Sequence, residues 1–216
     1  MRTTAWGYWI LVGAACGGCL HSPANYPGAG GSNIDPDQYM NAACPDLSGR
    51  YAGRGDLLEG DPNTQRWSKT MPIDYAFPFA SNAEQIAFYK PSESDGPTKG
   101  RSYPKVGELR KEGSRSFHFS VDYANGKSSS YVVSFENKGG FVCTGADGKI
   151  VWGGASKGGR SEFGPNSSDA MVMLYLDEQG NLISEETMQV HMSMLFGLIP
   201  TGTARYFSKY RYERIR

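Results

Sequence analysis

The sequence predicts an all-β fold, an antiparallel meander that forms a curled sheet, a small barrel or a sandwich. The clearest observation is residues 116–123, where large apolar residues alternate strictly with polar ones and an Asn-Gly turn follows. From Lys105 onwards, further strand-like segments are separated by turn residues, and none of them has helical periodicity. Regularly spaced short strands of this kind are typical of antiparallel β-domains.

Composition and charge fit one globular domain. The chain has 216 residues, of which 39% are hydrophobic and 12% aromatic, so it is long enough to bury a core. Its 22 Lys and Arg residues balance its 22 Asp and Glu residues. A neutral chain has no global basic field that would gather nucleic acid, so we expect no nucleic-acid partner.

The first fifteen residues are typical of an export signal. Arg2 supplies a positive start, and residues 5–15 form an uncharged, largely apolar run that ends in small residues. A membrane-spanning helix needs about 20 apolar residues, so this run has the length of a signal core and is too short for a span. We therefore expect residues 1–15 to be a signal peptide.

The junction Gly13-Ala14-Ala15-Cys16 resembles the lipobox of bacterial lipoproteins, in which small or apolar residues precede an obligatory cysteine. The resemblance implies that the signal is cut before Cys16 and that the cysteine sulfur takes a diacylglyceryl group. It also implies that the new N-terminus is often acylated, with palmitate as a usable label. The membrane would then be a partner through this lipid anchor.

Cys19 is the alternative anchor. The residues before it, Cys16-Gly17-Gly18, match the lipobox less well, but anchoring at Cys19 would leave Cys44 and Cys143 as an even pair. Because processing reads the local junction, we favour Cys16. Neither cysteine is followed by the Asp that tends to retain such lipoproteins at the inner membrane, so the resemblance favours the outer membrane, facing the periplasm.

Three segments follow the signal. Residues 16–43 are expected to be a flexible tether, because residues 21–43 are rich in Pro, Gly, Asn and Ala and have no sustained periodicity. Residues 44–216 are expected to form a single all-β domain that opens with a strand around Tyr51. Residues 54–104 are interrupted by prolines and are treated as an irregular insert, in which residues 84–89 fit either a short strand or a helical turn.

The remaining strands are expected in a regular succession. After residues 116–123 and their hairpin partner at 129–137, they fall at 141–145, 149–154, 170–176, 182–192 and 204–215.

Two cysteines of the domain are placed to form a disulfide. Cys44 precedes the first strand and Cys143 lies in a later one. An exported protein meets an oxidising compartment, so we expect these cysteines to be bonded; two buried reduced cysteines are the alternative.

No catalytic, metal or cofactor site is predicted. Residues 154–158 match the G-x-S-x-G pattern around Ser156, but a hydrolase nucleophile elbow must run into a helix, and glycines follow here instead. Met188, His191 and Met192 are residue types that bind copper(I). On a strand, however, His191 points away from the face that both methionines share, unless a bulge intervenes.

These observations favour a cell-envelope lipoprotein that acts as a non-enzymatic structural or accessory binding module, with an envelope protein as candidate partner. The candidate interaction loop is the apolar connection before the last strand, which either tucks into the core or forms an exposed patch. Its apolar residues are Leu195, Phe196, Leu198 and Ile199.

The alternative function is a carrier of a small apolar ligand, with a pocket inside the β-domain. The side chains expected to line that pocket are Phe117, Phe119, Tyr131, Val133, Met171 and Met173.

Overall fold

The computed structural model describes residues 36–60, 69–79, 81–93, 100–134, 141–161, 164–194 and 199–216. The predicted signal peptide, both candidate anchor cysteines and most of the tether lie outside these residues. So do Leu195, Phe196 and Leu198 of the candidate loop. Its last apolar residue, Ile199, begins a strand and pairs with Met194.

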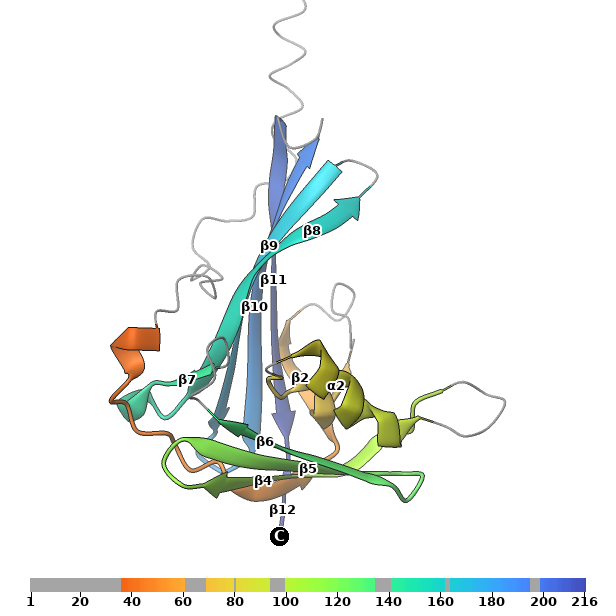
Figure 1. Ribbon diagram of the computed structural model, residues 1–216, viewed down its shortest axis with the longest axis vertical. Coiled ribbons are helices and arrows are strands. Elements are labelled where there is room, and N and C mark those ends of the chain that lie inside the picture. Colours follow the sequence, from red (N-terminus) through yellow and green to blue (C-terminus); the bar gives the residue numbers. More distant parts are fainter. Residues whose placement is uncertain are drawn as a thin grey trace, which may run out of the picture.

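The described strands form two antiparallel sheets (Figure 1). The first is five-stranded. In spatial order it contains β12 (Arg214–Ile215), β1 (Gly49–Ala52), β4 (Pro104–Glu112), β5 (Ser116–Tyr123) and β6 (Ser128–Ser134).

The second sheet is seven-stranded. In spatial order it contains β3 (Thr70–Pro72), β2 (Arg54–Gly60), β11 (Ile199–Tyr212), β10 (Leu182–Met194), β9 (Gly164–Leu176), β8 (Ile150–Ser161) and β7 (Phe141–Cys143). The prediction of an all-β fold is confirmed, in the form of two open sheets and not of a small barrel.

The long strands β8 to β11 extend well beyond the first sheet. Figure 1 shows them running from the five-stranded sheet towards the opposite end of the molecule. The end of β10 and the start of β11 lie at that far end, because Met194 pairs with Ile199 there.

The alternating sequence pattern explains the strands of the first sheet. Along β5 every second side chain is buried, from Phe117 to Tyr123, while the residues between them are partly or fully exposed. Turn residues close the hairpins: Gly126 and Gly180 have φ angles of 79° and 82°, which favour glycine. The side chain of Asp177 accepts hydrogen bonds from the backbone of the second of these turns.

Residues 54–104 are more regular than the sequence suggests. Besides β2 and β3 they contain α2 (Asn82–Tyr89) and three-residue 3-10 helices, η4 (Ile73–Tyr75) and η5 (Lys90–Ser92). The segment that fitted either a strand or a helical turn is therefore helical. Ser81 caps α2, since its side-chain oxygen accepts a hydrogen bond from the Glu84 N–H at 3.2 Å.

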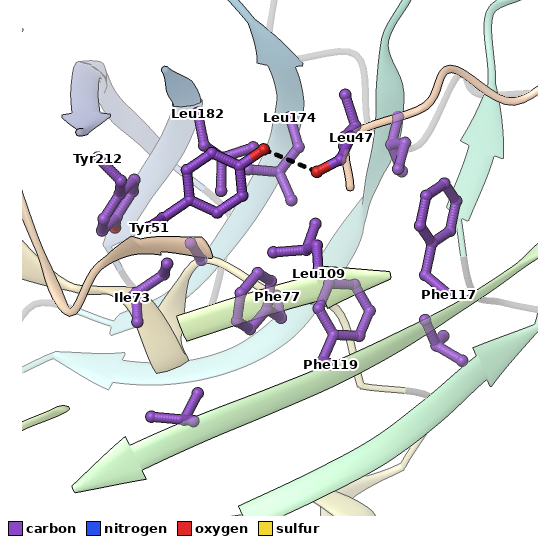
Figure 2. Packing of buried hydrophobic residues seen from close by; sticks show 14 of the residues in the cluster. Leu47, Tyr51, Ile73, Phe77, Leu109, Phe117, Phe119, Leu174, Leu182 and Tyr212 are labelled. Atoms are coloured by element: carbon purple, nitrogen blue, oxygen red, sulfur yellow. Dashed lines mark hydrogen bonds between the residues drawn. The ribbon is translucent and has the colours of Figure 1, made fainter. Parts of the chain in front are cut away.

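One core lies between the two sheets and the insert (Figure 2). Leu109 and Phe119 come from the five-stranded sheet, Leu174 and Leu182 from the seven-stranded sheet, and all four are at most 1% exposed. The buried Tyr51 hydroxyl donates to the Leu47 carbonyl at 2.7 Å, so its polar atom is satisfied within the core. Burial on this scale makes the hydrophobic effect the main source of stability.

The predicted disulfide is present. Cys44 and Cys143 are bonded, with their Cα atoms 4.9 Å apart, and both are buried. The bond ties the chain just before β1 to strand β7 across 99 residues of sequence. Next to it, the Lys111 ammonium group donates to the Cys44 carbonyl at 2.6 Å.

Removal of the disulfide tests how strongly it stabilises the fold. In the chain-entropy model, opening a loop of this length lowers the free energy of unfolding by about 4 to 5 kcal/mol. We expect the variant with both Cys44→Ala and Cys143→Ala to melt about 10 °C or more below the wild type, as measured by circular dichroism. Wild-type protein treated with a reductant should match the variant. Equal melting of the oxidised wild type and the variant would contradict this expectation.

Candidate functional site

A buried carboxylate is the most unusual polar group among the described residues. Asp74 lies in η4, and its side chain is only 2% exposed. One carboxylate oxygen, Oδ2, accepts hydrogen bonds from Arg101 Nη2 at 2.9 Å and from the Tyr123 hydroxyl at 3.2 Å. The backbone carbonyl of Asp74 accepts a further bond from the Tyr89 hydroxyl at 3.0 Å. Asp74 thus connects the insert to strand β5.

The guanidinium group of Arg101 lies against two aromatic rings. It lies 3.8 Å from the ring centroid of Tyr89 and 5.0 Å from that of Tyr75, and these rings stack with their centroids 5.1 Å apart. Arg101 also donates to the Tyr75 hydroxyl and, through Nε, to the Ser92 hydroxyl at 2.9 Å. We call Asp74, Arg101, Tyr75, Tyr89 and Tyr123 the Asp74 clamp.

Burial dominates the electrostatics of the clamp. Desolvation raises the pKa of Asp74, although Arg101 and the hydrogen bonds of the carboxylate act in the opposite direction. Burial also raises the pKa of the Tyr123 and Tyr89 hydroxyls, and the nearby Asp74 charge adds to the effect. With its carboxylate enclosed by protein, the clamp holds η4, α2 and η5 against the five-stranded sheet.

Asp74 also retains an unpaired oxygen. Within the described part of the chain, Asp74 Oδ1 and the Tyr212 hydroxyl are buried and have no hydrogen-bond partner. Desolvation raises the pKa of Tyr212, and the Asp74 charge contributes to that rise. Burying these two polar atoms without hydrogen-bond partners lowers the free energy of unfolding.

The six side chains expected to line an apolar pocket do not share one space. Phe117, Phe119 and Val133 belong to the core, where the ring of Phe119 lies 4.2 Å from that of Phe77 and 5.3 Å from that of Tyr131. The last two residues of the set, Met171 and Met173, lie elsewhere. They are three positions and one position before Leu174, which faces the core, so their side chains point to the opposite face of β9.

The sequence motifs that resemble chemical sites fall on ordinary strands. Ser156 lies inside β8, which continues to Ser161. His191 is exposed on β10 and its Nδ1 contacts the Thr203 hydroxyl at 3.0 Å, while the only register shift of the β10–β11 ladder follows Met192. The described residues contain no group of three or more His, Cys, Asp and Glu side chains that could hold a metal ion.

The basic C-terminal strand contains both buried and charged side chains. Tyr210 and Tyr212 of β11 point into the core, and Lys209 points to the other face. There the Lys209 ammonium group lies 4.0 Å from a carboxylate oxygen of Glu185, which accepts a hydrogen bond from the Tyr175 hydroxyl at 2.9 Å. The buried tyrosines and Lys209 therefore occupy opposite faces of this strand.

A scan against protein-family models, a search of curated proteins and a search of solved structures each find no match. Among the described residues, no helix is both long and apolar enough to cross a membrane.

The pH dependence of unfolding tests the raised pKa of Asp74. A carboxyl group whose pKa is higher in the folded than in the unfolded protein binds its proton more tightly when folded. Its contribution to stability is therefore present below the unfolded pKa of about 4 and is lost as the pH rises through the folded pKa. Asp74→Asn removes this titration.

We accordingly expect the free energy of unfolding of the wild type, minus that of Asp74→Asn, to be larger at pH 4 than at pH 7 in urea titrations. A difference that grows with pH would mean that Arg101 outweighs burial. Arg101→Met, which leaves the buried carboxylate uncompensated, should cost about 2 kcal/mol or more at pH 7. The matched control is Arg110→Met, which breaks an exposed pair with Glu112 and should cost within about 0.5 kcal/mol.

Proposed function

We propose that this protein is a cell-envelope lipoprotein, anchored through Cys16, whose domain acts as a non-enzymatic structural or accessory binding module. The signal-like start and the lipobox resemblance support the anchor. In this proposal residues 16–43 connect the lipid to the folded domain. The outer membrane, on its periplasmic side, is the favoured location.

The observation that carries the proposal is the disulfide between Cys44 and Cys143. Such bonds form and persist in oxidising compartments, which supports an exported protein. The bond also lies at the point where the tether enters the domain. A force on the lipid anchor would pass at Cys44 through the disulfide to β7 and not through strand β1 alone.

Hydrogen bonds reinforce the same junction. The side chain of Lys111 in β4 donates to the carbonyl of Cys44 at 2.6 Å, and its backbone N–H donates to the Ser48 hydroxyl at 2.9 Å. The Arg214 guanidinium donates to the Ser48 carbonyl at 2.7 Å. Residues 44–48 are thus fixed to both β4 and β12. Such fixing suits a domain that is held by its N-terminus.

The shape of the second sheet favours contact with another envelope component. The end of β10 and the start of β11 lie far from the five-stranded sheet (Figure 1). The connection between these strands contains the apolar residues that the sequence singles out as the candidate loop. A partner bound there would be held away from the sheet into which the anchored N-terminus leads.

Acyl labelling tests the anchor. We expect Cys16→Ser, expressed in a bacterium that processes lipoproteins, to lose incorporation of radioactive palmitate and to accumulate as an unprocessed precursor. Cys19→Ser is the matched control and should label and mature normally. Density-gradient separation of the membranes should place the labelled wild type in the outer-membrane fraction.

The two cysteine variants distinguish the possible failures of this proposal. Normal labelling of Cys16→Ser with loss in Cys19→Ser would move the anchor by three residues and leave the function unchanged. A wild type that takes no label, and that is recovered with free thiols at Cys44 and Cys143 after acid trapping, would refute the envelope proposal as a whole.

A further inference from the structure

Strand β6 ends the five-stranded sheet without a neighbour on its outer side among the described strands. It is seven residues long, from Ser128 to Ser134. The other terminal strands of the two sheets are shorter: β12 has two residues, and β3 and β7 have three each. An edge of this length presents a row of backbone groups that can pair with another strand.

The hairpin fixes which backbone groups face outward. At its closed end the Tyr123 N–H donates to the Lys127 carbonyl at 2.9 Å. Hydrogen-bonded pairs alternate along an antiparallel ladder, so Ser129, Tyr131 and Val133 are the residues whose backbone bonds to β5. The N–H and C=O groups of Ser128, Ser130 and Val132 point away from β5.

The helix of the insert does not use these groups. It contacts β6 through the alternate residues: the Ser129 hydroxyl donates to the Phe88 carbonyl, and the Phe88 ring lies 5.2 Å from that of Tyr131. Ser128, Ser130 and Val132 are all exposed, and Val132 is 54% exposed. The described part of the insert therefore leaves the side chains of Ser128, Ser130 and Val132 uncovered.

The sequence of β6 also lacks the residues that protect natural edges. Charged residues, prolines and bulges normally block edge-to-edge pairing. The sequence of β6 is SSSYVVS, and its register with β5 has no shift. By contrast, β3 contains Pro72, the long edge of β11 contains Pro200, and β8 has a register shift between Lys157 and Gly159.

We propose that the edge of β6 pairs with the same edge of a second copy of this chain. In an antiparallel arrangement with the two-fold axis at Tyr131, Ser130 lies opposite Val132 of the other copy, and Val132 lies opposite its Ser130. Both are outward-facing residues, so each pair exchanges two backbone hydrogen bonds. The two five-stranded sheets then continue as one sheet.

Charge favours a second copy as the occupant. No charged side chain of β6 opposes another in this register, since the strand has none. Asp122 of β5 pairs with Ser128 at one end of the strand, so the two-fold axis places the two Asp122 carboxylates at opposite ends of the interface. A self-complementary surface of this kind is what an isologous dimer requires.

Charge reversal across the interface tests this pairing. Ser130→Lys combined with Val132→Lys places like charges opposite each other twice, and Ser130→Glu combined with Val132→Glu does the same with acidic groups. For each variant alone we expect the dimer of the full chain, measured in a mild detergent by light scattering, to weaken by about tenfold or more. An equimolar mixture of the two variants should restore the dimer.

A matched control places the same charges one strand further in. His118 and Ser120 of β5 pair with Val132 and Ser130, respectively, but lie away from the edge. His118→Lys combined with Ser120→Lys should therefore leave the dimer intact. In the wild type, amide hydrogen exchange of Ser130 and Val132 should slow as the protein concentration rises, a readout that needs no variant.

Several results would overturn the proposal. A wild type that stays monomeric while its Ser130 and Val132 amides exchange independently of concentration would do so. So would dimers that persist in both charge variants, or a mixture of the variants that stays monomeric. If the wild type is monomeric and an extended peptide of another sequence protects the same amides, the edge belongs to a peptide partner.

Discussion

The arrangement of the two sheets depends on a corner at Gly53, the residue between β1 and β2. Its N–H donates to the Lys105 carbonyl in the five-stranded sheet, and its carbonyl accepts from the Ile73 N–H beside β3. A Cβ atom at this position would lie 2.2 Å from the Pro104 carbonyl oxygen, so only glycine allows so close an approach. The chain crosses back beside this corner, where Ala52 N–H donates to the Glu213 carbonyl between β11 and β12.

Two further links, the Asp74 clamp and the disulfide, connect other distant parts of the chain. The Asp74 clamp joins residues that are 27 positions apart in the pair Asp74–Arg101 and 49 apart in the pair Asp74–Tyr123, and it holds the insert on one side of the core. The disulfide joins positions 99 apart and fixes the start of the domain to β7. The disulfide persists in the unfolded chain, so closing a loop of this length restricts the unfolded state and stabilises the fold. The clamp thus fixes the insert to the five-stranded sheet, and the disulfide fixes the start of the domain to the seven-stranded sheet.

Residues that make local patterns were predictable from the sequence, and residues that act through distant partners were not. The alternation in β5 and the Asn-Gly turn give the first hairpin, and the cysteine positions indicate the disulfide. Helix α2 was ambiguous because Phe88 is its only buried side chain, which leaves no helical periodicity to detect. Strand β2 is largely exposed, so its sequence does not alternate between apolar and polar residues. Asp74 and Arg101 are ordinary residues in the sequence, and only the fold brings their charges together.

The edges of the two sheets differ in how they are protected, and this difference bears on function. In the seven-stranded sheet, β3 ends at Pro72 and β7 is bonded to Cys44, so both terminal strands are short and constrained. In the five-stranded sheet, β12 is short and carries Arg214, whereas β6 is long and uncharged. Among the described terminal strands, only β6 is longer than three residues, and it carries neither a charged residue nor a proline. This difference favours pairing of the β6 edge with another strand.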